Sequence, residues 1–151
     1  SLTGSKFNKY CFRVARNNWH DAAAGAYYMI DYLHAEKIAF LAADYSFGYS
    51  GVQTMSAEVA KRGGVIVGTE FAPLTTTDFT PYLNRLLAIP RVDVLMIIWA
   101  GSFGQLYQDM VSLDVFSHMN VSGAVIDILS MNSVEAQLEA VNSTLEGQMG
   151  L

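Results

Sequence analysis

The stretch KIAFLAADYSFGYSG, residues 37–51, decides the fold of this chain. Its first part, residues 37–42, is an apolar run without alternating polar positions, which is typical of a strand buried on both faces of a parallel sheet. The turn Asp44–Gly48 follows at once, and helical spacing of apolar residues then leads to a stop at Gly63 and Gly64. A helix that begins directly after a buried strand is the repeating unit of an α/β domain.

The same alternation continues on both sides of this stretch. Further strands are predicted at residues 10–15, 65–71, 93–99 and 123–129, and another begins at 147–151. Helices are predicted over about 20–34, from Thr80 and Pro81 to about 88, from Gly101 and Ser102 onward, and over about 133–141. The pattern predicts a doubly wound parallel sheet of about five strands with helices on both faces.

Asn17 and Asn18 indicate the start of the first helix. The helical spacing over residues 20–34 predicts one apolar face, made of Ala23, Ala26, Tyr27, Ile30 and Leu33.

The composition excludes several classes of function. Hydrophobic residues make up 52% of the 151 residues and charged residues only 15%, so the sheet is expected to be covered on both faces or to meet a missing partner. The net charge of −5 offers no basic surface to nucleic acid. The longest apolar run, residues 94–100, is far shorter than a membrane span. Cys11 is alone, so no internal disulfide is expected.

Three loops follow the predicted strands at their carboxyl ends, where ligands bind in open α/β sheets: residues 43–48, 99–102 and 127–132. Their aromatic walls, their small residues and the carboxylate of Asp127 suit a small amphiphilic ligand that carries an amine. The candidate residues are Tyr45, Ser46, Phe47, Trp99, Gly101, Ser102 and Asp127.

Enzyme chemistry finds little support in the sequence. Ser102 follows a strand and precedes a helix, as in a nucleophile elbow, but the motif lacks its first glycine and the later histidine, His118, precedes Asp127. Ser102 is better interpreted as a helix cap. No dinucleotide or P-loop motif exists and the three histidines are isolated, so we expect no cofactor, no metal and no catalytic activity.

Three stretches carry a resemblance to a known family: KIAFLAADYSFGYSG (37–51), KRGGVIVGTEFAPLTTTDFTPYL (61–83) and RVDVLMIIWAG (91–101). Together with YCFRVA (10–15) and Glu146–Gly147, they resemble the second lobe of the periplasmic binding proteins of the leucine/isoleucine/valine type. The resemblance implies that residues 1–151 form one α/β lobe of a type I periplasmic binding fold. It also implies that the first lobe and the C-terminal part of the parent protein are absent from the sequence.

The resemblance also implies a function and a set of site residues. Such proteins capture a branched-chain or other amino acid, or a related aromatic or amide molecule, between two lobes outside the cytoplasm and deliver it to an ABC permease. Phe47 matches a pocket position that is often tyrosine, Trp99 or Ala100 matches a strand-end position facing the ligand, and Asp127 matches the acceptor of an α-ammonium group.

A second interpretation stays open at this point. The same two-lobed architecture serves as the ligand-sensing domain of regulators and receptors, and the sequence of one lobe does not separate transport from sensing. A hydrolase that uses Ser102 is the more remote alternative.

Overall fold

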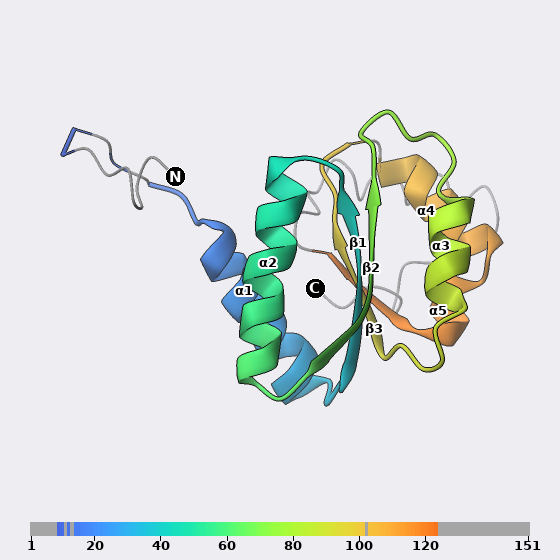
Figure 1. Cartoon of the computed structure of the whole chain (residues 1–151), viewed down its shortest axis with the longest axis horizontal. Helices are drawn as coiled ribbons and strands as arrows, with labels where there is room; N and C mark the ends of the chain where they lie inside the picture. The colour runs from blue at the N-terminus through green and yellow to red at the C-terminus, as the bar shows by residue number, and fades with distance from the viewer. Residues whose placement is uncertain (1–8, 11, 13, 102, 124–151) are drawn as a thin grey trace.

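The computed structural model of the chain describes residues 9–10, 12, 14–101 and 103–123 (Figure 1). Helices and strands alternate along this part of the chain, in the order α1 (Asn18–Ala26), η1 (Tyr27–Tyr32), β1 (Lys37–Ala43), α2 (Ser46–Lys61), β2 (Val65–Ala72), α3 (Thr80–Leu87), β3 (Val94–Ile98), α4 (Phe103–Ser112), α5 (Val115–His118) and β4 (Asn120–Gly123). Segment η1 is a π-helix that continues α1.

The described strands form one parallel sheet in the order β2-β1-β3-β4. Figure 1 shows three layers, with α1 and α2 on one face of the sheet and α3, α4 and α5 on the other. The chain therefore winds outward from β1 in both directions, which is the doubly wound arrangement that the sequence predicts. That predicted α/β fold is confirmed.

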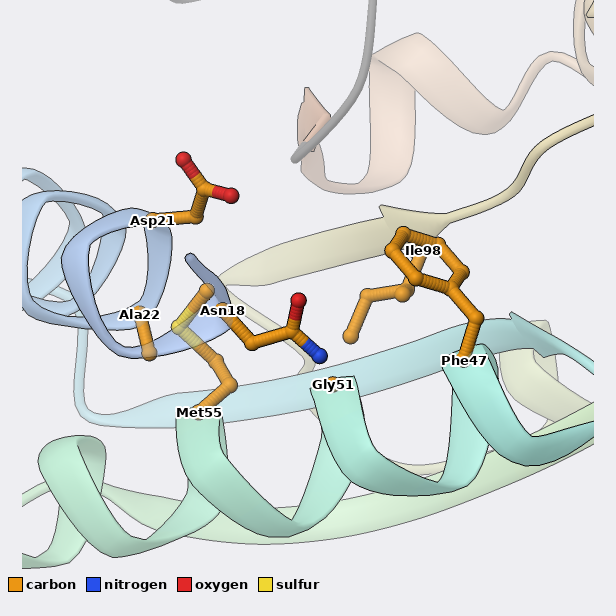
Figure 2. Close-up of a pocket in the computed structure, with 7 residues that line it drawn as sticks. All are labelled: Asn18, Asp21, Ala22, Phe47, Gly51, Met55 and Ile98. Carbon is orange, nitrogen blue, oxygen red and sulfur yellow. The ribbon is translucent and has the colours of Figure 1, made fainter. Parts of the chain in front are cut away.

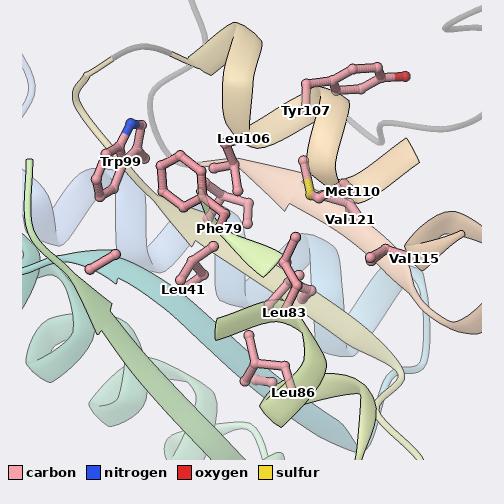
Figure 3. Packing of buried hydrophobic residues seen from close by; sticks show 14 of the residues in the cluster. Leu41, Phe79, Leu83, Leu86, Trp99, Leu106, Tyr107, Met110, Val115 and Val121 are labelled. Carbon is pink, nitrogen blue, oxygen red and sulfur yellow. The ribbon is translucent and has the colours of Figure 1, made fainter. Parts of the chain in front are cut away.

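Successive side chains of β1 and β3 point to opposite faces of the sheet, so the apolar residues of these strands belong to two separate cores. Ala39 and Leu41 of β1 and Ile97 of β3 pack with α3 and α4, in the core that Figure 3 shows. Phe40 and Ile98 point to the other face and pack with α1 and α2. Because both faces are covered, every residue of β3 is buried, and the strand has the continuous apolar sequence that marks it.

Two predicted strands differ from the structure. The described residues Tyr10, Phe12 and Val14 are not in a strand, and they are 79%, 84% and 102% exposed. An apolar run becomes a strand only where it pairs with a neighbouring strand, and none of the described strands pairs with Tyr10, Phe12 or Val14. The strand predicted at 123–129 begins earlier, because β4 starts at Asn120. The predicted helix at 133–141 and the strand at 147–151 lie outside the described residues.

The buried face of the first helix is also shifted from the prediction. Ala22, Ala26 and Met29 are buried, whereas Tyr27 is 56% exposed and Leu33 is 36% exposed. Alanine and aromatic residues occur all round this helix, so its apolar spacing fits more than one face.

Asp93 joins the amino ends of β1 and β3. Its carboxylate accepts hydrogen bonds from the backbone N–H groups of Glu36 (2.8 Å) and Lys37 (2.9 Å), and pairs with Arg91 Nε at 3.1 Å. Its own backbone N–H donates to the carbonyl of Lys37 (2.8 Å), and its carbonyl accepts from the N–H of Asn120 in β4 (3.1 Å). One residue therefore fixes the relative positions of three strands where they begin.

We expect Asp93→Asn to lower the free energy of unfolding by about 2 kcal/mol near neutral pH, because a charged acceptor of two backbone N–H groups is lost. Burial alone would raise the pKa of Asp93, but the N–H groups of Lys37 and Glu36 and the Arg91 guanidinium together hold it below its ordinary value. A carboxyl with a lowered pKa stabilises the folded state above its unfolded pKa of about 3.9, and this contribution disappears as the pH falls through the folded pKa.

Urea denaturation at a series of pH values checks this prediction. The difference between the wild type and Asp93→Asn should shrink below about pH 4. Glu36→Gln is the control, because Glu36 forms an exposed ion pair with Arg91 and such pairs contribute less than about 1 kcal/mol. Equal losses in the two variants would contradict the role of Asp93.

Candidate ligand-binding site

The carboxyl ends of β1, β2 and β3 meet at one edge of the sheet. Strand β1 ends at Ala43, β2 at Ala72 and β3 at Ile98. The N–H of Asp44 donates to the carbonyl of Ala72 at 2.8 Å, so the loop that leaves β1 is tied to the end of β2. This edge is where open α/β sheets bind their ligands.

Gly48 fixes how α2 leaves β1. A Cβ atom on Gly48 would lie 1.9 Å from the carbonyl oxygen of Ala43, the last residue of β1. Tyr45, the residue before the helix, is extended, and its N–H donates to that same carbonyl at 2.8 Å. Only glycine allows the first turn of α2 to lie this close to the strand, and this contact sets the position of Phe47.

A small pocket lies at this edge between the amino-terminal halves of α1 and α2 (Figure 2). It encloses about 20 Å³, which is room for one group of the size of a water molecule. The pocket is mostly apolar, with polar groups only on the α1 side. Its lining residues are Asn18, Asp21 and Ala22 from α1, Phe47, Gly51 and Met55 from α2, and Ile98 at the end of β3.

Hydrogen bonds and an ion pair hold the polar side of the pocket in place. The Nδ2 group of Asn18 donates to Ser50 Oγ at 2.8 Å, and Ser50 Oγ donates to the carbonyl of Phe47 at 3.1 Å. Asp21 pairs with Arg16, with 2.7 Å between Oδ1 and Nε. The pocket therefore offers a positioned amide and a carboxylate whose charge is already balanced.

The predicted site residues of the first loop lie around this pocket. Phe47 lines it and is half-buried, and the ring of half-buried Tyr45 lies 5.9 Å from the Phe47 ring. Ser46 is exposed beside them, as are Ala100 and Gly101 after β3.

Two predicted residues, Asp127 and Ser102, lie outside the described residues. Their assignments, Asp127 to a ligand ammonium and Ser102 to a helix cap or a nucleophile, therefore stay predictions from the sequence alone.

Trp99 lies inside the core and not at the surface of the edge. It is 3% exposed, and its ring packs edge-on against Phe79 with 5.1 Å between centroids (Figure 3). Its Nε1 atom is buried without a hydrogen-bond partner among the described residues. A Cβ on Gly101 would lie 2.9 Å from this nitrogen, so Gly101 covers the indole. The residues that are exposed to solvent after β3 are Ala100 and Gly101.

Asn18, Asp21 and Tyr49 belong to this edge although sequence reasoning did not single them out. Asn17 and Asn18 indicated only a helix start, and the pocket becomes visible only when α1 packs beside α2. Tyr49 is half-exposed, and its ring packs against Phe71 at 4.8 Å. The hydroxyl of Tyr49 donates to Asp44, and this hydrogen bond, with some desolvation and the negative charge of Asp44, raises the pKa of Tyr49.

A larger and wider groove, of about 460 Å³, lies at the opposite edge of the sheet. Its charged groups are already occupied, because Arg91 pairs with Glu36 and Asp93 while Asp93 caps backbone N–H groups. Since size alone does not make a binding site, we favour the carboxyl edge, where the polar groups converge on an apolar pocket.

The part of the chain that the structure describes contains no group of three or more metal-ligating side chains. None of the helices in that part has the length and apolar character that crossing a bilayer requires.

Comparison with known proteins now identifies the class. A sequence model of the family described as periplasmic binding protein matches residues 1–146. The chain therefore belongs to the periplasmic binding protein family. A search of curated protein sequences finds no match.

Solved structures agree with this assignment. An ABC-type branched-chain amino acid transporter protein from Rhodopseudomonas palustris is 32% identical, with a TM-score of 0.68 over 81% of this chain and 33% of its own. An amino acid ABC transporter substrate-binding protein from Pseudomonas fluorescens is 20% identical, with a TM-score of 0.79 over 91% and 37%. A solute-binding protein from Rhodopseudomonas palustris in complex with 3,4-dihydroxybenzoic acid is 23% identical, with a TM-score of 0.59 over 70% and 28%.

The chain spans about a third of the length of these structures. The resemblance predicted from residues 37–51, 61–83 and 91–101 is confirmed, and the fold is that of one lobe of a type I periplasmic binding protein of the ABC transporter class.

We expect Gly48→Ala to destabilise the lobe by at least about 2 kcal/mol, because the new methyl group meets a backbone carbonyl that cannot move without breaking the end of β1. Gly25→Ala is the matched control. Its Cβ would meet the flexible ends of two side chains, Met55 at 3.0 Å and Met96 at 3.4 Å, and no backbone atom, so its effect should stay within about 1 kcal/mol. Thermal and urea denaturation measure both variants, and a Gly48→Ala protein as stable as Gly25→Ala would contradict the close contact.

Proposed function

We propose that this chain is one lobe of the extracytoplasmic substrate-binding component of an ABC transporter. The whole protein would capture a branched-chain or other amino acid, or a related aromatic or amide molecule, and deliver it to a permease in the membrane. The observation that carries the proposal is the pocket at the carboxyl edge, lined by Phe47, in a chain that belongs to the periplasmic binding protein family.

The size of the pocket supports a shared site. A cavity of about 20 Å³ holds one small group and not a whole amino acid, so the remaining contacts must come from elsewhere. The open edge around it, with Tyr45, Ser46, Ala100 and Gly101, leaves room for a second lobe to close over the ligand. We therefore propose that this lobe supplies half of the contacts and the missing first lobe supplies the other half.

Capture then follows from hinge closure. Each lobe alone makes few contacts with the ligand, and the closed form becomes the more stable one only when the ligand bridges both. The isolated lobe should therefore bind weakly. For an amino-acid ligand, Asp127 is the proposed acceptor of the ammonium group, and Trp99 would act from beneath Gly101 as a support of the site.

Binding without chemical change is the proposed role. The solved relatives described above are solute-binding proteins. We infer the same for this chain, together with a location outside the cytoplasmic membrane.

We expect Phe47→Ala in the full-length protein to weaken ligand binding at least tenfold, or about 1.4 kcal/mol, because the ring forms one wall of the pocket. A thermal-shift screen with branched-chain and aromatic amino acids, their amides and aromatic acids first identifies a ligand, and calorimetry then compares the variants. Phe116→Ala is the control, because Phe116 is also half-buried but lies at the opposite edge. The proposal falls if no compound of the screen raises the melting temperature or if Phe47→Ala binds as well as Phe116→Ala.

A further inference from the structure

Helix α1 and the π-helix η1 that continues it have an exposed face with few charges. Residues 18–32 contain two carboxylates, Asp21 and Asp31, and no lysine or arginine. Tyr27 and Tyr32 on this segment are 56% and 66% exposed. Interfaces between proteins are depleted of most charged residues and enriched in tyrosine. The exposed face therefore has the composition of an interface.

Four exposed residues form one line along this face, and we call them the seam. They follow one another at steps of four, three and four residues, which is the spacing of a coiled-coil stripe. A π-helix takes more residues per turn than an α-helix, so the last step of four stays on the stripe as well. Because Ala22, Ala26 and Met29 face the core, the seam points away from it. Its residues are His20, Ala24, Tyr27 and Asp31.

The seam is complementary to itself when it is read in the opposite direction. In an antiparallel pair of seams with a two-fold axis between Ala24 and Tyr27, Ala24 of each copy faces Tyr27 of the other, so a small side chain meets a large one. At the two ends, His20 of each copy faces Asp31 of the other, so an N–H donor meets a carboxylate. An interface with two-fold symmetry contains each of these contacts twice.

The polar groups of the seam are already held in place within one copy. Nδ1 of His20 accepts the N–H of Asn17 at 3.2 Å, so the neutral ring carries its proton on Nε2 and donates from there. Asp31 pairs with Arg62 through Oδ2, and the guanidinium of Arg62 also lies over the ring of Tyr27, 5.5 Å from its centroid. Side chains that are held before association lose less conformational entropy when they associate.

We propose that the seam is a homodimer interface, in which the α1–η1 segments of two copies pack antiparallel about a two-fold axis. The inference goes beyond the proposed function, because it does not depend on the identity of the ligand. One helical segment from each copy makes a small interface, so we expect a reversible dimer with a dissociation constant of the order of 10 μM.

Sedimentation equilibrium of the full-length protein from about 1 to about 200 μM measures this association. The mean mass of the wild type should rise from that of one copy toward that of two. Ala24→Glu places a charge at the centre of the seam and should weaken the dimer at least about tenfold. Ala57→Glu is the control, because it makes the same change at an exposed position of α2 and should leave the dimer unchanged.

A charge reversal tests the antiparallel arrangement. In His20→Glu the new carboxylate still accepts the N–H of Asn17, as in a capping box, but it faces Asp31 of the other copy and should weaken the dimer at least about tenfold. Asp31→Lys added to His20→Glu places opposite charges together again and should restore most of the association. Circular dichroism and thermal denaturation establish that each variant folds, and Ala24→Glu alone decides if the double variant does not.

Three results would overturn the inference. They are a wild type that stays monomeric up to the highest concentration, an Ala24→Glu protein that dimerises as well as Ala57→Glu, and a folded double variant that dimerises no better than His20→Glu. A monomer that still binds a ligand in the thermal-shift screen would leave the proposed function standing.

Discussion

The contact between Gly48 and the carbonyl of Ala43 is the constraint on which the candidate ligand-binding edge depends. A side chain at position 48 would have to occupy the place of a backbone atom at the end of β1, so α2 would begin elsewhere. Because α2 begins at this contact, Phe47 points into the pocket and Ser50 reaches Asn18 across the gap between two helices. One missing Cβ atom thus determines both the apolar and the polar sides of the site.

The amino and carboxyl edges of the sheet are held in place by different contacts. At the amino edge, Asp93 fixes the starts of β1, β3 and β4 through backbone hydrogen bonds. At the carboxyl edge the strands end in exposed loops beside the candidate site. Between them, the two central strands are buried on both faces, so they connect the edges as a rigid layer that reaches the candidate pocket through Ile98, at the end of β3.

Much of the fold could be predicted from the sequence, because buried strands and turns leave local signals. The apolar run at residues 37–42 and the turn before Gly48 predicted β1 and the start of α2 correctly. The run at residues 10–15 has a similar composition, but whether it pairs depends on a neighbour that local sequence does not reveal. Of the residues that line the candidate pocket, the sequence singled out Phe47. Asn18 comes to the pocket only because α1 packs against α2, a contact between residues distant in the sequence. Trp99 also depends on a distant contact. The sequence alone does not determine whether its ring points to solvent or, as in the structure, into the core against Phe79.

The separation of the two edges has a consequence for the evolution of such lobes. Under the proposed function, substitutions that alter ligand preference would fall at positions such as Asn18 and Ala100, which take no part in the hydrogen bonds of Asp93 that anchor the strands. A duplicated gene can therefore acquire a new ligand by changes at one edge while its product still folds, and the lineage does not have to pass through unstable ancestors.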